Sequence, residues 1–199
     1  DMALGRISLP ATLTTIGESA FAECDGIGEV WILDNNGLVI GDEAFTGCDS
    51  LTGAYLGAGT AALGNRVFRY CEAMTWVSMP EGLLSIGERC FSATNLAEVT
   101  IPSTVTTIGE AAFHSNASLV GVQIPAGVSI LESNTFQDCT SLYWVWFSDG
   151  LSIVRDDAFY GCSNLTQVYF SGTTESWNAV SKGNNEVLTR AELYADYYG

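Results

Sequence analysis

The sequence predicts an α/β solenoid, a single elongated domain in which one short unit is repeated and each copy stacks on the next. The main observation is a phenylalanine that recurs at intervals of 24, 23, 23, 22, 23 and 23 residues: Phe21, Phe45, Phe68, Phe91, Phe113, Phe136 and Phe159. Leu, Ile and Val also stand at matching places in most units. Repeats of roughly 20–29 residues with regular aliphatic positions are the signature of a leucine-rich-repeat solenoid, whose units bury a shared core.

Each unit contains a predicted β-strand with an apolar, variable, apolar pattern. The clearest unit has Val99-Thr100-Ile101, and the pattern recurs at 30–32, 77–79, 122–124, 145–147 and 168–170. Alternation with period two buries one face of a strand and exposes the other. The four prolines all follow the second inward residue of such a strand: Pro10, Pro80, Pro102 and Pro125. Proline cannot donate to a parallel ladder, so we expect about eight or nine short strands on the concave side of a horseshoe.

The next part of each unit predicts a short helical turn on the convex side. Its pattern is Ile-Gly-Glu-x-Ala-Phe, as in 108–113. Acidic residues suit the first turn of a helix, because the helix dipole favours negative charge there. Gly47 and Gly161 permit left-handed geometry where the turn ends.

Four units depart from the pattern, and we expect their turns to differ while the register is kept. The second and third units have Asp34-Asn35-Asn36-Gly37 and Gly57-Ala58-Gly59-Thr60 in place of the Ile-Pro turn. The sixth and seventh replace the glycine of the second pattern by Glu132 and Arg155.

The charge balance excludes several classes of partner. Seven Lys and Arg residues stand against 23 Asp and Glu residues, a net charge of −16, which repels nucleic acid and anionic lipid. No segment approaches the roughly 18 consecutive apolar residues of a membrane span. The repeat pattern is already under way at Ile7-Ser8-Leu9-Pro10, as in a trimmed chain, so the missing signal peptide does not argue against secretion.

These units resemble the BspA-type leucine-rich repeats of bacterial cell-surface and secreted proteins. The resemblance rests on Ile-Pro after the strand, Ile-Gly-Glu-x-Ala-Phe, and then Cys-x-x-Leu, and it covers almost the whole chain. It implies an array of about seven units over residues 1–171 and a capping segment of the same domain over 172–199. It also implies a secreted or cell-surface location and a role in adhesion or recognition, although a repeat identifies a scaffold and not a ligand.

Five of the six cysteines stand three residues after the phenylalanine: Cys24, Cys48, Cys71, Cys139 and Cys162. Thr94 and Asn116 take that place in the other two units, so we expect a small inward side chain that bonds to nearby backbone. The stacking distance permits disulfides between neighbouring cysteines, but we favour buried free thiols, because parallel side chains rarely offer the required torsion. Zinc is less favoured still, since no CxxC pair is present.

No catalytic constellation is visible, and we expect a protein that is not an enzyme and needs no cofactor. His114 is the only histidine, with no serine, cysteine or acid at a spacing that predicts a triad. Phosphate-binding loops, HExxH and GxSxG are absent. Asp34-Asn35-Asn36-Gly37 and Asp156-Asp157 are oxygen-rich, but neither follows a known calcium loop, and we expect no metal.

The candidate binding residues are aromatic side chains at outward positions of the strands. Trp31, Tyr55, Trp146 and Tyr169 form one column, and Trp76 and Trp144 form the next. We call these six residues the aromatic strip. Exposed apolar patches usually mark an interaction site, and polar neighbours such as Glu29, Glu98, Gln123 and Gln167 suit protein hot spots or stacking on sugar rings. Aromatic residues are also good strand formers, and packing across strands is a nearly equal explanation.

These observations favour an extracellular or cell-surface adhesion module that binds a protein through its concave aromatic face, on a host or a neighbouring cell. The alternatives are a glycan-binding module or a structural spacer within a larger secreted multidomain protein. Nucleic-acid binding and membrane insertion are not expected.

Overall fold

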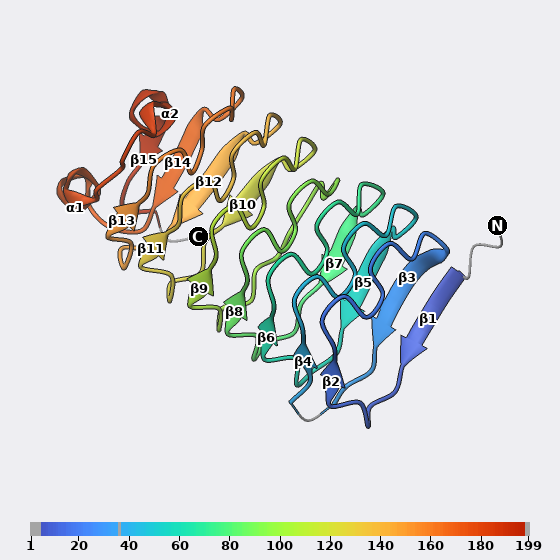
Figure 1. Ribbon diagram of the computed structural model, residues 1–199. Coiled ribbons are helices and arrows are strands. Elements are labelled where there is room, and N and C mark those ends of the chain that lie inside the picture. The colour runs from blue at the N-terminus through green and yellow to red at the C-terminus, as the bar shows by residue number, and fades with distance from the viewer. Residues whose placement is uncertain (1–4, 36, 198–199) are drawn as a thin grey trace.

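The computed structural model describes residues 5–35 and 37–197, which form a row of stacked coils from the N-terminal to the C-terminal end (Figure 1). The predicted parallel solenoid is confirmed. Most coils contribute one longer strand and one two-residue strand, and equivalent strands of neighbouring coils pair in parallel. The horseshoe curvature stays a prediction.

The longer strands form two four-stranded parallel sheets, ordered β1-β3-β5-β7 and β10-β12-β14-β15. We call their outward surface the β-face. The strands are β1 (Gly5–Leu9), β3 (Ile27–Ile32), β5 (Gly53–Leu56), β7 (Trp76–Ser78), β10 (Gly121–Gln123), β12 (Trp144–Phe147), β14 (Gln167–Phe170) and β15 (Glu192–Tyr194). Inward and outward residues alternate as expected: Val145 and Phe147 of β12 are buried, while Trp144 and Trp146 are half-buried.

The two-residue strands form a second edge of each coil. They pair as a five-stranded sheet, β2-β4-β6-β8-β9, and a two-stranded sheet, β11-β13. Their bounds are β2 (Thr15–Ile16), β4 (Val39–Ile40), β6 (Ala62–Leu63), β8 (Ser85–Ile86), β9 (Thr107–Ile108), β11 (Ile130–Leu131) and β13 (Ile153–Val154).

A glycine follows most of these short strands, because the backbone of the neighbouring coil leaves no room for a side chain. A Cβ on Gly87 would lie 2.3 Å from the carbonyl oxygen of Gly64, and one on Gly109 would lie 2.6 Å from the nitrogen of Glu88. The sixth unit carries Glu132 at this position, and the short-strand ladder is interrupted between β9 and β11. The turns that follow Glu132 and Arg155 nevertheless keep the left-handed residues of the other units, so the expected difference is not seen in these turns.

The third edge of each coil, which we call the turn edge, corrects the prediction of helical turns. In every unit the residues two before and two after the repeated phenylalanine have positive φ, as at Ala111 (54°) and Ser115 (59°) around Phe113. A left-handed residue interrupts an α-helix, so each segment is a pair of tight turns. In the part of the chain that the structure describes, helices occur only after the repeats, as α1 (Thr174–Ala179) and α2 (Glu186–Arg190).

The turn edge is held by backbone hydrogen bonds between coils. The N–H of Phe113 donates to Thr135 O at 2.9 Å, and the N–H of Ser115 donates to Gln137 O at 2.8 Å, with matching bonds in other units. A left-handed non-glycine residue costs roughly 1–2 kcal/mol, and an unpaired buried N–H costs about as much. The left-handed conformation lets every second N–H of the turn pair with the neighbouring coil, and these hydrogen bonds offset its cost.

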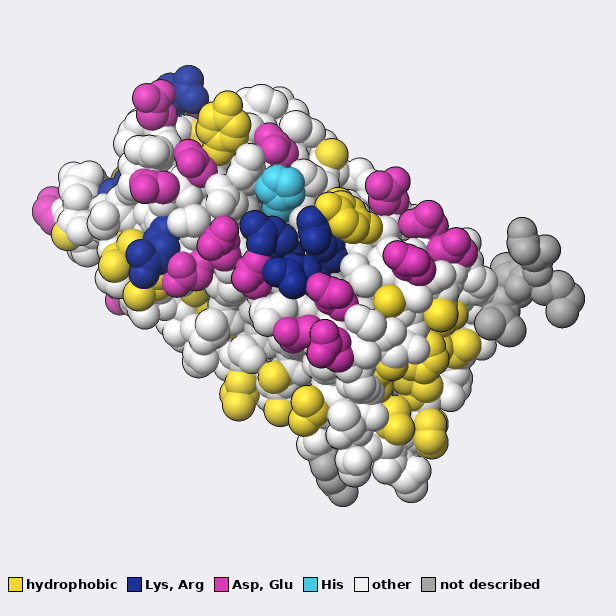
Figure 2. All heavy atoms as spheres, viewed as in Figure 1, with side chains coloured by type: hydrophobic (Ala, Val, Ile, Leu, Met, Phe, Trp, Pro, Cys, Tyr) yellow, Lys and Arg dark blue, Asp and Glu magenta, His cyan; other side chains and the backbone are white. Residues whose placement is uncertain are grey.

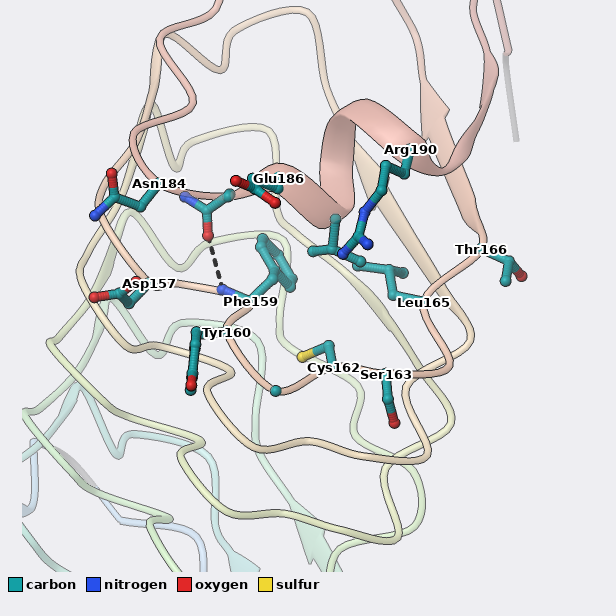
Figure 3. A pocket seen from close by; sticks show the side chains of 13 residues that line it. Asp157, Phe159, Tyr160, Cys162, Ser163, Leu165, Thr166, Asn184, Glu186 and Arg190 are labelled. Carbon is teal, nitrogen blue, oxygen red and sulfur yellow. Dashed lines mark hydrogen bonds between the residues drawn. The ribbon is translucent and has the colours of Figure 1, made fainter.

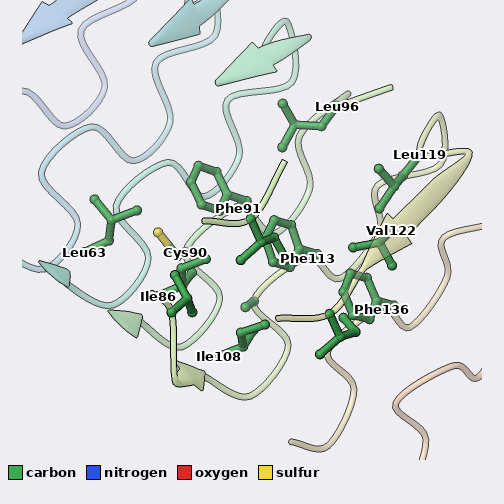
Figure 4. Packing of buried hydrophobic residues seen from close by; sticks show 14 of the residues in the cluster. Leu63, Ile86, Cys90, Phe91, Leu96, Ile108, Phe113, Leu119, Val122 and Phe136 are labelled. Atoms are coloured by element: carbon green, nitrogen blue, oxygen red, sulfur yellow. The ribbon is translucent and has the colours of Figure 1, made fainter. Parts of the chain in front are cut away.

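The core beneath the turn edge is a continuous stack of the seven phenylalanine rings. Neighbouring ring centroids lie 5.1–5.5 Å apart with interplanar angles of 2–14°. Figure 4 shows Phe91, Phe113 and Phe136 in this stack, surrounded by aliphatic side chains of both strand edges. The regular spacing shows that the stack runs through all seven units, and the strands of the second, third, sixth and seventh units keep their parallel register.

The cysteines line the core beside this stack. All six belong to the described residues and are free thiols; Cys24 is half-buried and the other five are buried. Cys71 Sγ donates to Phe45 O at 3.2 Å and Cys139 Sγ to Phe113 O at 3.2 Å, so the expected inward bond to backbone is present. Burial raises the pKa of Cys162 to about 12 and also raises that of Cys139, so these thiols stay protonated.

The predicted strand at Val99-Thr100-Ile101 is wrong. Residues 98–101 form no ladder with β7 or β10, and we call this segment the sheet break. Its unit is one residue short: the aliphatic residue before the strand follows the phenylalanine by five positions, as Leu96 after Phe91, and by six elsewhere, as Leu119 after Phe113. The missing residue lies before Leu96, and Val99 and Ile101 still face the core while Thr100 is exposed, so the segment keeps its inward face but forms no ladder.

The side chain of Asn116 supplies hydrogen bonds to this shortened turn. Its Nδ2 donates to Phe91 O at 2.8 Å and to Phe113 O at 2.9 Å, while its Oδ1 accepts from Thr94 Oγ1 at 2.6 Å and from Leu96 N at 3.2 Å. Asn116 and Thr94 therefore form one buried network, whereas the sequence pattern treated them as interchangeable with cysteine.

The segment after the repeats provides strand pairing, ring packing and hydrogen bonds to the last coil. β15 pairs with β14, and Trp177 of α1 packs on Phe147 and Phe170 at centroid distances of 5.7 and 5.2 Å. Asn185 Oδ1 accepts the N–H of Phe159 at 2.9 Å, the bond drawn dashed in Figure 3, and so stands where a further coil would offer a carbonyl. Its Nδ2 donates to Arg155 O and Lys182 O at 2.7 and 2.6 Å.

Phe113→Ala is expected to lower the free energy of unfolding by roughly 3–5 kcal/mol, because a fully buried ring between two stacked neighbours is lost. Phe21→Ala is the matched control, since Phe21 is half-buried and stacks on one side only. Urea denaturation of both variants measures the difference. Equal midpoints would contradict the cooperative stack.

Asn185→Ala is expected to cost about 1–3 kcal/mol, because the Phe159 N–H loses its acceptor in a buried place. The neighbouring Asn184 is exposed, and Asn184→Ala should change stability little. Thermal unfolding of the two variants gives the comparison, and similar losses in both would show that Asn185 does not close the array.

Native protein at pH 8 should react with iodoacetamide at Cys24 first, because the other five thiols are buried. After denaturation without reductant, intact mass should show six labels, since all six cysteines are free. A pair that resists labelling until reductant is added would contradict the free-thiol arrangement.

Candidate ligand-binding face

The structure places all six residues of the aromatic strip on the β-face, each half-buried. Strand register sets the two expected columns. Trp31 pairs with Tyr55 in one sheet, and Trp146 pairs with Tyr169 in the other. In the second column, Gly53 pairs with Trp76 and Gly121 pairs with Trp144. The strip is not continuous, however, because the sheet break divides it into two clusters.

The first cluster lies on β1, β3, β5 and β7 and is closely packed. Trp31 stacks on Tyr55 at 5.2 Å and meets Trp76 edge-on at 6.3 Å between ring centroids. The guanidinium of Arg6 lies 4.3 Å above the Trp31 ring. Glu29 Oε2 accepts from Trp31 Nε1 and from Arg6 Nε, both at 3.0 Å. These bonds, the one from Trp31 first, lower the pKa of Glu29, so the carboxylate stays charged.

The second cluster lies on β12, β14 and β15 and includes two tyrosines that the sequence analysis missed. Tyr169 stacks on Tyr194 at 4.9 Å and contacts Tyr197 at 4.7 Å between ring centroids. Tyr169 Oη donates to Gln167 Oε1 at 2.9 Å. The strand Glu192-Leu193-Tyr194 repeats the pattern of Gln167-Val168-Tyr169, so Tyr194 could have been found from the sequence, whereas Tyr197 follows the last strand and has no such signal.

The sheet break opens a groove of about 580 Å³ between the two clusters. Its walls are the irregular segment on one side and β10 and β12 on the other. The residues that line it include Glu98, Thr100, Ile101, Gly121, Gln123, Trp144 and Trp146. The groove therefore combines two residues of the aromatic strip with carboxylate, hydroxyl and amide groups, including the predicted polar neighbours Glu98 and Gln123.

Glycine positions the indole of Trp144 at the wall of this groove. A Cβ on Gly121 would lie 2.0 Å from Cε2 of Trp144, so the indole lies flat against the backbone of the preceding strand. Trp76 lies over Gly53 in the same way, 2.1 Å from a Cβ there. Trp146 differs: its Nε1 is buried and has no acceptor among the described residues.

The oxygen-rich segments weighed for calcium are occupied by turn bonds. Asp34 Oδ1 accepts from Ala58 N and Asn35 Oδ1 from Leu38 N, each at 2.9 Å, while Asn36 lies outside the described residues. Asp156 Oδ1 accepts from Asn184 N at 3.0 Å. Within residues 5–35 and 37–197, no group of three or more His, Cys, Asp and Glu side chains is arranged to hold a metal ion.

A second hollow, of about 660 Å³, lies at the C-terminal end of the array between the last turn and α2 (Figure 3). Tyr160, Cys162 and Leu165 line it from the turn, and Glu186 and Arg190 line it from α2. It occupies the place where a further coil would stack, so we assign it to the end of the array. None of the described helices is both long and apolar enough to cross a membrane.

Comparison with known proteins agrees with this architecture. The family model of the BspA type leucine rich repeat region matches residues 1–120 and 106–181 in six copies. Among curated proteins, none matches the chain.

Solved structures give the same result. A leucine-rich repeat protein from Bacteroides ovatus is similar with 27% identity and a TM-score of 0.76 over 83% of this chain and 47% of its own. The chain therefore spans less than half of that protein. The T. pallidum leucine rich repeat protein is similar with 27% identity and a TM-score of 0.70, over 82% of this chain and 86% of its own. A leucine-rich repeat protein from Eubacterium ventriosum, at 15% identity and a TM-score of 0.50, covers 98% of this chain and 68% of its own and shares the fold alone.

Proposed function

The chain belongs to the BspA-type leucine-rich-repeat family, and from that premise we propose that it is a recognition module that binds a protein ligand through the aromatic residues of its β-face. Leucine-rich-repeat proteins commonly mediate protein interactions. The family is generally non-enzymatic, and we assign the chain no catalytic role.

The observation that carries the proposal is the groove at the sheet break. It joins the half-buried rings of Trp144 and Trp146 to the polar groups of Glu98, Thr100 and Gln123 in about 580 Å³. Tryptophan and tyrosine dominate binding hot spots, because they offer a large contact area at a small entropic cost. A ligand side chain that enters the groove can contact both indoles.

The first cluster is suited to a supporting role. Trp31, Tyr55 and Trp76 pack on one another, and the polar atoms of Trp31, Arg6 and Glu29 are satisfied within the cluster. Such preorganised rings can bury area against a partner without rearrangement. We therefore expect the groove to supply most of the affinity and the first cluster to supply additional contact area.

We also propose a secreted or cell-surface location, on a host-facing or neighbour-facing surface. The proposal is supported by the family and by the net charge of −16, which suits an exposed soluble module. The partner would be a protein of a host or of a neighbouring cell.

Glycan binding is the second candidate, because the indole of Trp144 lies flat on the backbone of Gly121 beside Gln123 and Glu98. A flat indole beside carboxylate and amide groups suits stacking on a sugar ring with bonds to its hydroxyls. A structural spacer is the third, because the rings of the first cluster also fill space between strands.

The double variant Trp144→Ala with Trp146→Ala should weaken ligand binding by more than roughly 2 kcal/mol, because both rings border the groove. Its stability should change little, since both side chains are half-buried. The measurement is tryptophan fluorescence and binding to ligands found by screening extracellular-matrix proteins and a glycan array. A hit confined to the matrix proteins supports the protein-binding proposal, and a hit confined to glycans supports the second candidate.

The matched control is Tyr160→Ala, which removes an exposed aromatic ring of the turn edge and should bind as wild type. Normal binding by the double variant would show that the β-face is not the site. The spacer would then be the better explanation.

A further inference from the structure

Three of the seven cationic side chains gather at the middle of the turn edge, on a protein of net charge −16. Arg66, Arg69 and Arg89 come from two neighbouring coils, and His114 lies beside them on the next coil. Figure 2 shows Lys and Arg side chains beside the histidine, with Asp and Glu side chains around them.

Two of these arginines are neutralised by glutamates. Arg66 pairs with Glu43 at 3.1 Å and with Glu88 at 3.6 Å. Arg89 pairs with Glu88 and, at 3.8 Å, with Glu110. Arg66 and Arg89 therefore belong to a chain of ion pairs that links successive coils.

Arg69 is different, because it forms no ion pair with any carboxylate of the described residues. Its guanidinium lies 4.2 Å above the ring of Tyr70, and its Nη2 donates to Tyr70 Oη at 2.6 Å. Its Nε is buried and has no acceptor among the described residues. The aromatic ring thus fixes the orientation of the guanidinium, while its positive charge has no carboxylate partner among the described residues.

Arg69 and Arg89 line a pocket of about 310 Å³, which we call the cationic pocket. Its other polar walls are Ser92, His114, Ser115 and Gln137. Hydroxyl, amide and guanidinium groups are the donors that bind oxyanions, and hydrogen bonds from a charged guanidinium are stronger than those between neutral groups. The volume is at the lower end of ligand pockets and suits one anionic group with a few attached atoms.

We propose that the cationic pocket binds the oxyanion group of a ligand, a carboxylate, sulfate or phosphate, with Arg69 as its main charge partner. The site is on the turn edge and is independent of the groove on the β-face.

His114 provides a second contact and a pH dependence. The groups that face its ring are Ser92 Oγ, 3.4 Å from Nδ1, Asp138 Oδ2, 3.8 Å from Nε2, and the cations Arg89 and Arg69. Burial chiefly lowers the pKa of His114; Asp138 opposes this effect, and the two arginines add to it. An anion at Arg69 offsets the positive charge, so binding should raise the pKa of His114 and should tighten as pH falls.

Ser92, His114 and Asp138 do not form a catalytic triad, although the fold brings them together in a way that their spacing in the sequence did not predict. The Asp138 contact is too long for a hydrogen bond, and Ser92 is 4% exposed. Without a hydrogen bond from Asp138 to orient the imidazole, the arrangement suits binding rather than nucleophilic chemistry.

The test uses the one histidine as its probe. The Cε1–H signal of His114 is followed by NMR over pH 5–9 in chloride, acetate, sulfate or phosphate at equal ionic strength. We expect at least one oxyanion to raise the pKa of His114 above its value in chloride, with millimolar affinity of the order that a few charge-assisted bonds give. Acetate separates a carboxylate site from one for the tetrahedral ions.

Arg69→Gln should weaken the effective oxyanion at least about tenfold, while Arg190→Gln, with the same loss of charge on α2, should leave it unchanged. If Arg69→Gln is unstable, the titration of the wild-type protein in the four salts still tests whether an oxyanion binds. No difference between chloride and the three oxyanions would overturn the proposal, and so would an unchanged response in folded Arg69→Gln. Neither result bears on the Trp144 and Trp146 variant, so the two sites are tested separately.

Discussion

The hydrogen bonding of each turn to the same turn of the next coil is the constraint on which the protein depends. It requires left-handed residues on both sides of every repeated phenylalanine, and it places those rings about one coil spacing apart in a single stack. A unit by itself has neither the acceptors for its turn nor a face for its ring. Folding of the array, the depth of the core and the need for Asn185 at its end all follow from this arrangement.

The sequence predicted the elements that depend on a single unit and missed those that depend on two. The phenylalanine interval and the alternation in strands such as 144–147 predicted the solenoid and its register. The segment Ile-Gly-Glu-x-Ala-Phe was expected to be helical because its acidic start is typical of helix N-termini. Its turns are instead determined by acceptors in the next coil, as Thr135 O is for Phe113, and one repeat cannot reveal them. The sheet break was detectable, because the interval of 22 residues between Phe91 and Phe113 contains the deletion.

In the candidate sites, too, the features set by a single unit were predictable and those set by neighbouring units were not. The outward positions of Trp144 and Trp146 can be read from alternation alone, but the groove beside them exists because the adjoining coil is one residue short. The cationic pocket was not predicted. Arg69 and His114 both directly follow a repeated phenylalanine, but they lie two units apart, and Arg89 stands two residues before the phenylalanine of the unit between them. Their proximity depends on the stacking of coils, and the free donor of Arg69 depends on which glutamates its neighbours bind.

The one-residue deletion also sets how forces pass along the molecule. On each side of it, a four-stranded ladder ties the coils together. Across residues 98–101 the β-face has no ladder, and the coils are joined by the phenylalanine stack, the turn edge and, toward the preceding coil, the β8–β9 ladder. Because this junction has no β-face ladder, we expect local opening to be easier here than within either four-stranded sheet. The groove that carries Trp144 and Trp146 lies at that place. The β-face is therefore least continuous beside two of the candidate binding residues.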